Sequence, residues 1–222
     1  WIISPRITSQ ASTDLQAFPP ILQQILFNRG LGTDAEARAF LRAQPNFNPD
    51  PFQFTGMQTA VDRIQYALNH NEPIAIYGDY DVDGVTATAL LVRVLEKLRA
   101  KVSFFIPNRF SDGYGLHLDC IRELKETFHP DLLISVDCGV RSVEEVRASS
   151  ELGMDWIITD HHSLGTELPP AKAIVHPQIG DYPNRALAGV GVAFKLAQGL
   201  LEAAPLTTSI SHCPQDSAPV HA

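Results

Sequence analysis

The chain has 222 residues, of which 45% are hydrophobic and 19% charged, and its formal net charge at pH 7 is −8. This composition excludes a disordered chain and favours one principal globular domain, because domains usually contain roughly 100 to 200 residues. The net negative charge excludes a broad basic surface for nucleic-acid duplexes. Any nucleic-acid contact should be confined to a local groove or pass through metal ions.

The sequence carries no targeting or membrane signal. No apolar run approaches the roughly 18 to 20 residues of a membrane helix, and residues 1–6 lack the pattern of a signal peptide. We therefore expect a cytoplasmic protein without a membrane partner, and we expect a monomer; because the sequence does not begin with Met, it is also compatible with a fragment. Cys120, Cys138 and Cys213 contain no Cys-x-x-Cys pair, which argues against a disulfide framework or a zinc ribbon.

The first part of the chain has helical periodicity. Apolar side chains recur at helical spacing within residues 14–70, in the stretches 21–26, 35–41 and 57–68. Residues 44–51 are rich in Pro, Asn and Phe, as is typical of a loop between helices. We expect residues 1–72 to form a helical N-terminal segment.

From Pro73 onward, short apolar runs alternate with helical patterns. The expected strands are residues 74–77, 102–106, 132–136, 156–159 and 173–175, and the expected helices are 85–99, 118–128, 142–152 and 189–201. Such alternation is typical of parallel βαβ units. We therefore predict an α/β fold in residues 73–202, with a parallel five-stranded sheet flanked by helices on both faces, and an irregular tail over residues 203–222.

Acidic residues and histidines follow three of the expected strands. In open α/β sheets ligands collect at the carboxyl ends of the strands, so we expect these side chains to converge. The residues are Asp79, Asp81 and Asp83 after the first strand, Asp137 after the third, and Asp160, His161 and His162 after the fourth. Each has a structural alternative when taken alone, since an Asp after a strand is often a helix N-cap and a His pair is often surface or core.

The three closely spaced aspartates could also begin a calcium loop. Asp79, Asp81, Asp83 and Gly84 match the start of an EF-hand loop, but the twelfth position is Leu90 where calcium needs a bidentate Glu. Carboxylate and imidazole ligands without a thiolate cluster favour Mn²⁺ or Mg²⁺ over structural zinc. The candidate ligands are more numerous than one such ion needs, and two ions about 3.5 to 4 Å apart would bind all of them. Such a pair of ions favours phosphoester hydrolysis.

Five motifs together resemble the DHH phosphoesterases, and within that family the single-strand-specific DNA exonucleases that digest from the 5′ end. They are GDYDVDGVT (78–86), IPNRFSDGYGL (106–116), SVDCG (135–139), TDHH (159–162) and LAGVGVAFK (187–195). The helical segment before residue 72 is also similar to these exonucleases, so the resemblance covers about residues 20–201. It implies an enzyme that acts on single-stranded DNA in repair and recombination.

The resemblance also implies roles for the site residues. Asp81 and Asp137 would hold one Mn²⁺ or Mg²⁺ ion with Asp79 beside them, and Asp83, Asp137 and His161 would hold a second, so that Asp137 bridges the two. His162 would contact the scissile phosphate and assist the leaving oxygen as an acid.

Three further residues would support these ligands or the substrate. Asp160 would orient its neighbours, and Arg109 with the glycine loop around Tyr114 would position phosphates of the strand. For Tyr114, stacking on a base and burial as a structural ring remain alternatives, and for Arg109 a structural ion pair does.

The chain departs from the family pattern at two points. The family has a further aspartate and a Gly-Gly-His domain downstream, and residues 206–213 match neither, so we expect weak or no activity from this chain by itself. His176 stands where the family usually has Asn, and we expect it to be solvent-exposed. Two other functions stay open: a DHH phosphoesterase for small molecules or short oligonucleotides, and a DHH module without catalysis.

Overall fold

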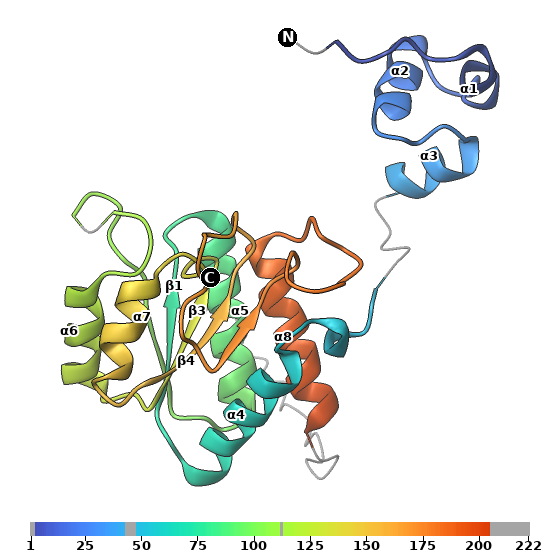
Figure 1. The fold of residues 1–222 in the computed structure, drawn as a ribbon. Coiled ribbons are helices and arrows are strands. Elements are labelled where there is room, and N and C mark those ends of the chain that lie inside the picture. Colours follow the sequence, from blue (N-terminus) through green and yellow to red (C-terminus); the bar gives the residue numbers. More distant parts are fainter. Residues whose placement is uncertain (1–2, 43–47, 112, 205–222) are drawn as a thin grey trace, which may run out of the picture. The chain divides into compact units, whose positions relative to one another are not determined.

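The structure is a computed structural model that describes residues 3–42, 48–111 and 113–204 (Figure 1). The chain forms two compact units, Trp1–Asn48 and Pro49–Ala222. This division differs from the expected boundary after residue 72, because the last helix of the expected N-terminal segment packs in the core of the second unit.

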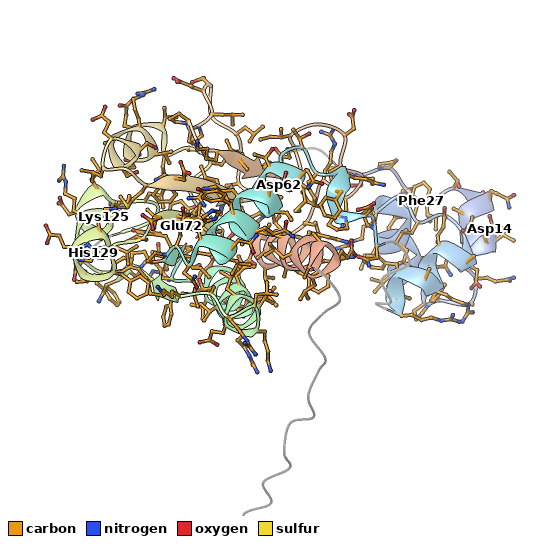
Figure 2. All side chains as sticks on the ribbon, turned by 90° about the horizontal axis from the view of Figure 1, so that it is seen from below. Asp14, Phe27, Asp62, Glu72, Lys125 and His129 are labelled. Atoms are coloured by element: carbon orange, nitrogen blue, oxygen red, sulfur yellow. The ribbon has the colours of Figure 1, made fainter. Side chains whose placement is uncertain are left out.

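The first unit consists of short helices around a small core. They are α1 (Ser9–Asp14), α2 (Pro20–Asn28) and α3 (Asp34–Leu41). The helix α1 was not expected, since the apolar periodicity begins only at residue 14; its N-terminus is capped by the Thr8 side chain. A reciprocal capping box between Thr33 and Glu36 starts α3. Asp14 and Phe27 mark this unit in Figure 2.

The second unit contains the predicted parallel sheet. Its strands are β1 (Ile74–Gly78), β2 (Val102–Phe105), β3 (Leu132–Val136), β4 (Asp155–Thr159) and β5 (Ala173–Val175), in the order β2-β1-β3-β4-β5. All four strand pairs are parallel. β1, β3 and β4 are almost wholly buried, which explains why they appear in the sequence as continuous apolar runs.

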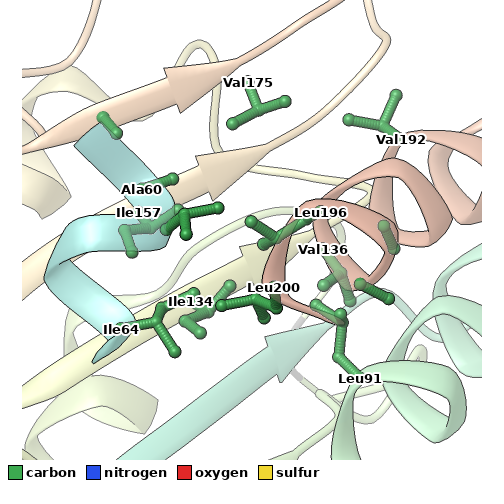
Figure 3. Packing of buried hydrophobic residues seen from close by; sticks show 14 of the residues in the cluster. Ala60, Ile64, Leu91, Ile134, Val136, Ile157, Val175, Val192, Leu196 and Leu200 are labelled. Carbon is green, nitrogen blue, oxygen red and sulfur yellow. The ribbon is translucent and has the colours of Figure 1, made fainter. Parts of the chain in front are cut away.

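Helices cover both faces of the sheet, as predicted. α4 (Met57–His70), α5 (Val82–Lys97) and α8 (Gly189–Ala203) cover one face, and α6 (Leu118–Phe128) and α7 (Val143–Ser150) cover the other (Figure 1). Successive strand residues alternate between the two cores, because side chains of a strand point to opposite faces. Ile134 packs towards α4 and α8 with Ile64 and Leu196 (Figure 3), whereas Leu133 lies in the opposite core.

The expected N-terminal segment divides because α4 buries its apolar stripe on the sheet. Ala60 and Ile64 have no exposed surface and contact the strands (Figure 3). The short 3-10 helix η1 (Pro51–Gln53) precedes α4, and the buried Lys195 Nζ donates to the carbonyl of Pro49 over 2.6 Å. These contacts bring residues 49–72 into the second unit.

Within the described ranges, no helix combines the length and apolar character needed to cross a membrane.

Candidate metal centre

The strand order places a topological switch point between β1 and β3. The connection from β1 leads outward to β2, whereas the chain after β3 continues on the other side to β4 and β5. Ligands of open α/β sheets bind at such a switch point, beyond the carboxyl ends of the strands. The segments after β1, β3 and β4 therefore share one edge of the sheet, and they carry the acidic residues and histidines predicted as a site.

The segment after β1 presents three carboxylates in different surroundings. Asp79 is only 3% exposed and its Oδ1 has no hydrogen-bond partner; burial, together with the charge of Asp81, raises its pKa. Asp81 is the N-cap of α5 and accepts from the Gly84 N–H over 3.0 Å. Asp83 accepts from the N–H groups of Gly189 and Val190 at 2.7 and 2.6 Å, and thereby caps the N-terminus of α8.

Asp137, directly after β3, is the most constrained residue of the site. Its φ is 61°, in the left-handed region that few residues other than glycine adopt and that is often found at functional sites. The residue is 1% exposed, and among the described residues its Oδ1 accepts no hydrogen bond of good geometry, although His161 Nε2 lies 3.1 Å away. Burial and the nearby charges of Asp83 and Asp81 raise its pKa to about 8. The fold thus holds a carboxylate where its charge is unfavourable without a cation.

A buried aspartate organises the segment after β4. Asp160 Oδ1 accepts from the N–H groups of His161 and His162 at 2.7 and 3.1 Å, and Oδ2 accepts from the Val140 N–H at 2.9 Å. Its Oδ1 also lies 2.8 Å from His162 Nδ1. Although burial acts against ionisation, the hydrogen bonds from His162 and Val140 lower the pKa of Asp160, and the same bond raises the pKa of His162.

The three segments converge on Asp137. Ligand atoms of Asp79, Asp81 and Asp137 lie within 4.8 Å of one another, and so do those of Asp137, His161 and His162. His161 Nε2 is 3.1 Å from Asp137 Oδ1 and 3.6 Å from Asp83 Oδ2. Asp137 belongs to both groups, which is the arrangement expected of a bridging ligand.

The donor set fits a divalent cation such as Mn²⁺ or Mg²⁺. Among the described residues, the buried Oδ1 atoms of Asp79 and Asp137 accept no hydrogen bond, and the ion pairs give neither carboxylate a lysine or arginine. Oxygen and imidazole ligands without thiolate suit these ions. Unpaired buried carboxylates are costly, and a shared cation would remove that cost.

The two residues predicted to position phosphates lie differently. Tyr114 is 51% exposed and its hydroxyl is 3.1 Å from His162 Nδ1, so its ring is not a buried structural one. The Arg109 guanidinium lies over the Tyr80 ring, 5.2 Å from its centroid, and has no carboxylate partner among the described ion pairs. Asp112, in the same loop, lies outside the described residues.

The expectation that His176 is exposed is wrong. His176 directly follows β5 and has no exposed surface. Its Nε2 lies 2.8 Å from the carbonyl oxygen of His162, and its Nδ1 accepts from the Gln178 N–H over 3.1 Å. Burial lowers the pKa of His176.

The N-terminus of α8 is the second contribution that the sequence did not predict. A Cβ at Gly189 would collide with the carboxylate of Asp137, so the glycine in the GVGV motif allows α8 to approach the site closely. The GVGV motif is visible in the sequence and could have indicated a close approach of this helix. Its partners Asp83 and Asp137 lie far away along the chain. Residues 206–213, where the family's later aspartate was sought, lie outside the described residues.

Comparisons with known proteins identify the family. The family model "DHH family, N-terminal domain" matches residues 73–214. The single-stranded-DNA-specific exonuclease RecJ of Bacillus subtilis is 49% identical over 188 residues, which are 84% of this chain and 24% of that protein.

Solved structures give the same relationship. A crystal structure of the exonuclease RecJ bound to manganese has a TM-score of 0.65 and 38% identity, covering 70% of this chain and 40% of that one. RecJ of Thermus thermophilus in complex with Mn²⁺ has a TM-score of 0.64 and 32% identity, covering 87% of this chain and 26% of that one. The chain spans only about a quarter of the B. subtilis protein and of the T. thermophilus protein. By fold, motifs and family match, this chain belongs to the DHH family.

Proposed function

We propose that this chain is the metal-dependent catalytic part of a single-stranded-DNA exonuclease that digests from the 5′ end. One observation carries the proposal: the buried Asp137, whose Oδ1 accepts no hydrogen bond in the described part of the chain, is shared by two groups of ligand atoms at the switch point of the sheet. The similarity to exonucleases solved with manganese supports the choice of ion and substrate.

The ligand roles follow from this arrangement. Asp79, Asp81 and Asp137 would hold one divalent ion, and Asp137 with His161 would hold the second. Asp83, whose Oδ2 lies 3.6 Å from His161 Nε2, would be a further ligand of the second ion. Bound there, the two ions would supply positive charge for the phosphate and activate the attacking water. Both oxygens of Asp83 already accept N–H groups of α8, so Asp83 would also connect this helix to the metal centre.

The residues around the ligands would act on the substrate. His162 donates its Nδ1 proton to Asp160, which leaves Nε2 to face the phosphate, and the raised pKa helps the ring to keep a second proton for the leaving oxygen. Tyr114, with its hydroxyl beside His162, and the exposed Arg109 would contact phosphates of the strand.

The test is hydrolysis of end-labelled single-stranded DNA. We expect Mn²⁺-dependent release of mononucleotides from the 5′ end, weak for this chain by itself, and its loss in Asp81→Ala and Asp137→Ala. Because the chain spans 24% of the B. subtilis relative, the same assay is also run on a chimera of that relative in which this chain replaces the matched segment. Equal activity of the variants and the unaltered protein, or an inert chimera beside an active parent, would refute the proposal.

A substrate panel separates the alternative within the same chemistry. The acidic charge of −8 favours small substrates over long nucleic acids. If the chain cleaved pyrophosphate, a cyclic dinucleotide or short oligonucleotides faster than single-stranded DNA, the small-molecule function would replace the one proposed here. If it bound Mn²⁺ and cleaved none of these, the non-catalytic module would be favoured.

We also propose that the protein acts in DNA repair and recombination, in the cytoplasm and as a monomer. The single-strand specificity named for its relatives supports a role in repair. Light scattering should return one chain mass, 24.4 kDa, and a doubled mass would exclude the monomer.

A further inference from the structure

His176 contacts the candidate metal centre through the backbone carbonyl of His162. β4 and β5 pair up to Thr159 and Val175, and the Asp160 N–H donates to the Val175 carbonyl over 3.3 Å. The two segments then separate, so the strand ladder gives the carbonyl of His162 no donor. In the described hydrogen bonds, His176 Nε2 takes that place at 2.8 Å.

The hydrogen bonds of His176 fix its protonation. Its Nδ1 accepts the Gln178 N–H over 3.1 Å and therefore carries no proton. Its Nε2 faces a carbonyl oxygen, which can only accept, and therefore carries the proton. The ring is thus the neutral Nε2–H tautomer, fully buried and satisfied at both nitrogens.

Together with Asp160, this ring holds His162 on three sides. Asp160 Oδ1 takes the backbone N–H and faces ring Nδ1, and His176 holds the backbone carbonyl. In the described part of the chain, ring Nε2 is the polar atom of His162 that remains without a hydrogen bond. The direction in which Nε2 is presented therefore depends on His176.

We propose that His176 is a positioning residue, which fixes the 161–162 segment by donating from Nε2 to the carbonyl of His162. This inference rests on the proposed function, since it concerns how the same site presents His162 to a phosphate. His176 does not touch the substrate, and loss of its hydrogen bond should misplace the reacting groups without removing any ligand. Orienting partners of this kind typically contribute roughly 10- to 100-fold.

A matched pair of substitutions isolates the hydrogen bond. His176→Gln places an amide N–H near the position of Nε2, whereas His176→Met has the same length and no donor. We expect His176→Met to lower kcat for Mn²⁺-dependent hydrolysis of bis(p-nitrophenyl) phosphate roughly 10- to 100-fold with little change in KM, and His176→Gln to recover most of it. His70→Met is the control, because His70 is exposed and ends α4 where β1 is about to begin, at the opposite end of the sheet.

Histidine ¹⁵N spectra give a readout that does not need activity. In the unaltered chain the signals lost on substitution of His176 should show the Nε2–H tautomer, and the His162 ring signals should move in His176→Met and stay in place in His176→Gln. An Nδ1–H tautomer at His176, equal kcat values for Met and unaltered chains, or equal losses in Met and Gln would overturn the inference. If neither this chain nor the chimera hydrolyses a phosphodiester, the proposed function fails, and the spectra still decide the role of His176.

Discussion

Acidic residues at the two ends of the sheet differ in whether they pair with a lysine or arginine. At the amino end, Arg63 pairs with Glu72 and Asp155, each at 2.7 Å, and Lys172 also lies 3.6 Å from Asp155 (Glu72 is labelled in Figure 2). At the carboxyl end, Asp79 and Asp137 are more deeply buried, and the described ion pairs give neither of them a lysine or arginine; Asp137 Oδ1 has His161 Nε2 at 3.1 Å. Acids at the first end stabilise the fold with the chain's own cations, and acids at the second end are arranged for a cation that the chain does not supply.

The largest expected effect comes from removing one acid at each end of the sheet and comparing Mn²⁺ binding. Asp137→Ala should weaken Mn²⁺ binding by more than the roughly 100-fold typical of an outer partner, because it removes a ligand shared by both groups. Asp155→Ala removes an acid of the amino end and should leave Mn²⁺ binding unchanged. Calorimetric titration of both variants measures this, and similar losses in both would contradict the distinction between the two ends.

The second prediction concerns pH and the metal-free protein. The pKa of Asp137 is raised to about 8 in the folded state, whereas an unfolded Asp has a pKa of about 3.9. Between these values the folded state binds more protons, so stability should fall as pH rises, by roughly 3 kcal/mol from pH 5 to pH 7 for this group.

Urea unfolding with a chelator at several pH values measures this slope. Asp137→Asn cannot titrate and should lack that part of the pH dependence, and Mn²⁺ should suppress it in the unaltered chain. A variant with the same slope as the unaltered protein would show that Asp137 is not the group responsible.

The third prediction tests the amino end alone. Arg63 is 14% exposed and bridges α4 to β4, so Arg63→Met should lower the free energy of unfolding by about 2 kcal/mol, less than for a fully buried pair. Mn²⁺ affinity should stay unchanged, because the site lies at the other end of the strands. Urea unfolding and calorimetry on the same sample check both parts; a loss of metal affinity as large as that of Asp137→Ala would contradict the separation.

The smallest expected effect comes from crowding the metal centre. Gly189→Ala would press a methyl group against the Asp137 carboxylate, and we expect Mn²⁺ binding to weaken by about tenfold, or 1.4 kcal/mol. Gly191→Ala in the same helix is the matched control, since a Cβ there meets the Leu187 side chain at 3.0 Å, away from Asp137. If both variants bound Mn²⁺ equally well, close approach of α8 would not matter for the site.

The sequence by itself determined the parallel sheet and the residues that gather at its carboxyl end. Continuous apolar runs such as 132–136 mark buried strands, and an Asp or His just after such a run lies at the ligand edge wherever the strand is placed. These signals are local, so the alternation of strands and helices and the convergence of Asp79, Asp137 and His161 could be predicted without coordinates.

Only the tertiary structure decided which partners each side chain has. Periodicity could not show that α4 packs on the sheet, because an amphipathic helix has the same pattern in either unit. Nor could it show that His176 is buried against His162 or that Asp83 caps α8 across 106 residues of sequence, because both contacts arise from packing between distant segments. The sequence supplied the types of the candidate ligands, and the fold supplied their burial and the hydrogen bonds that orient them.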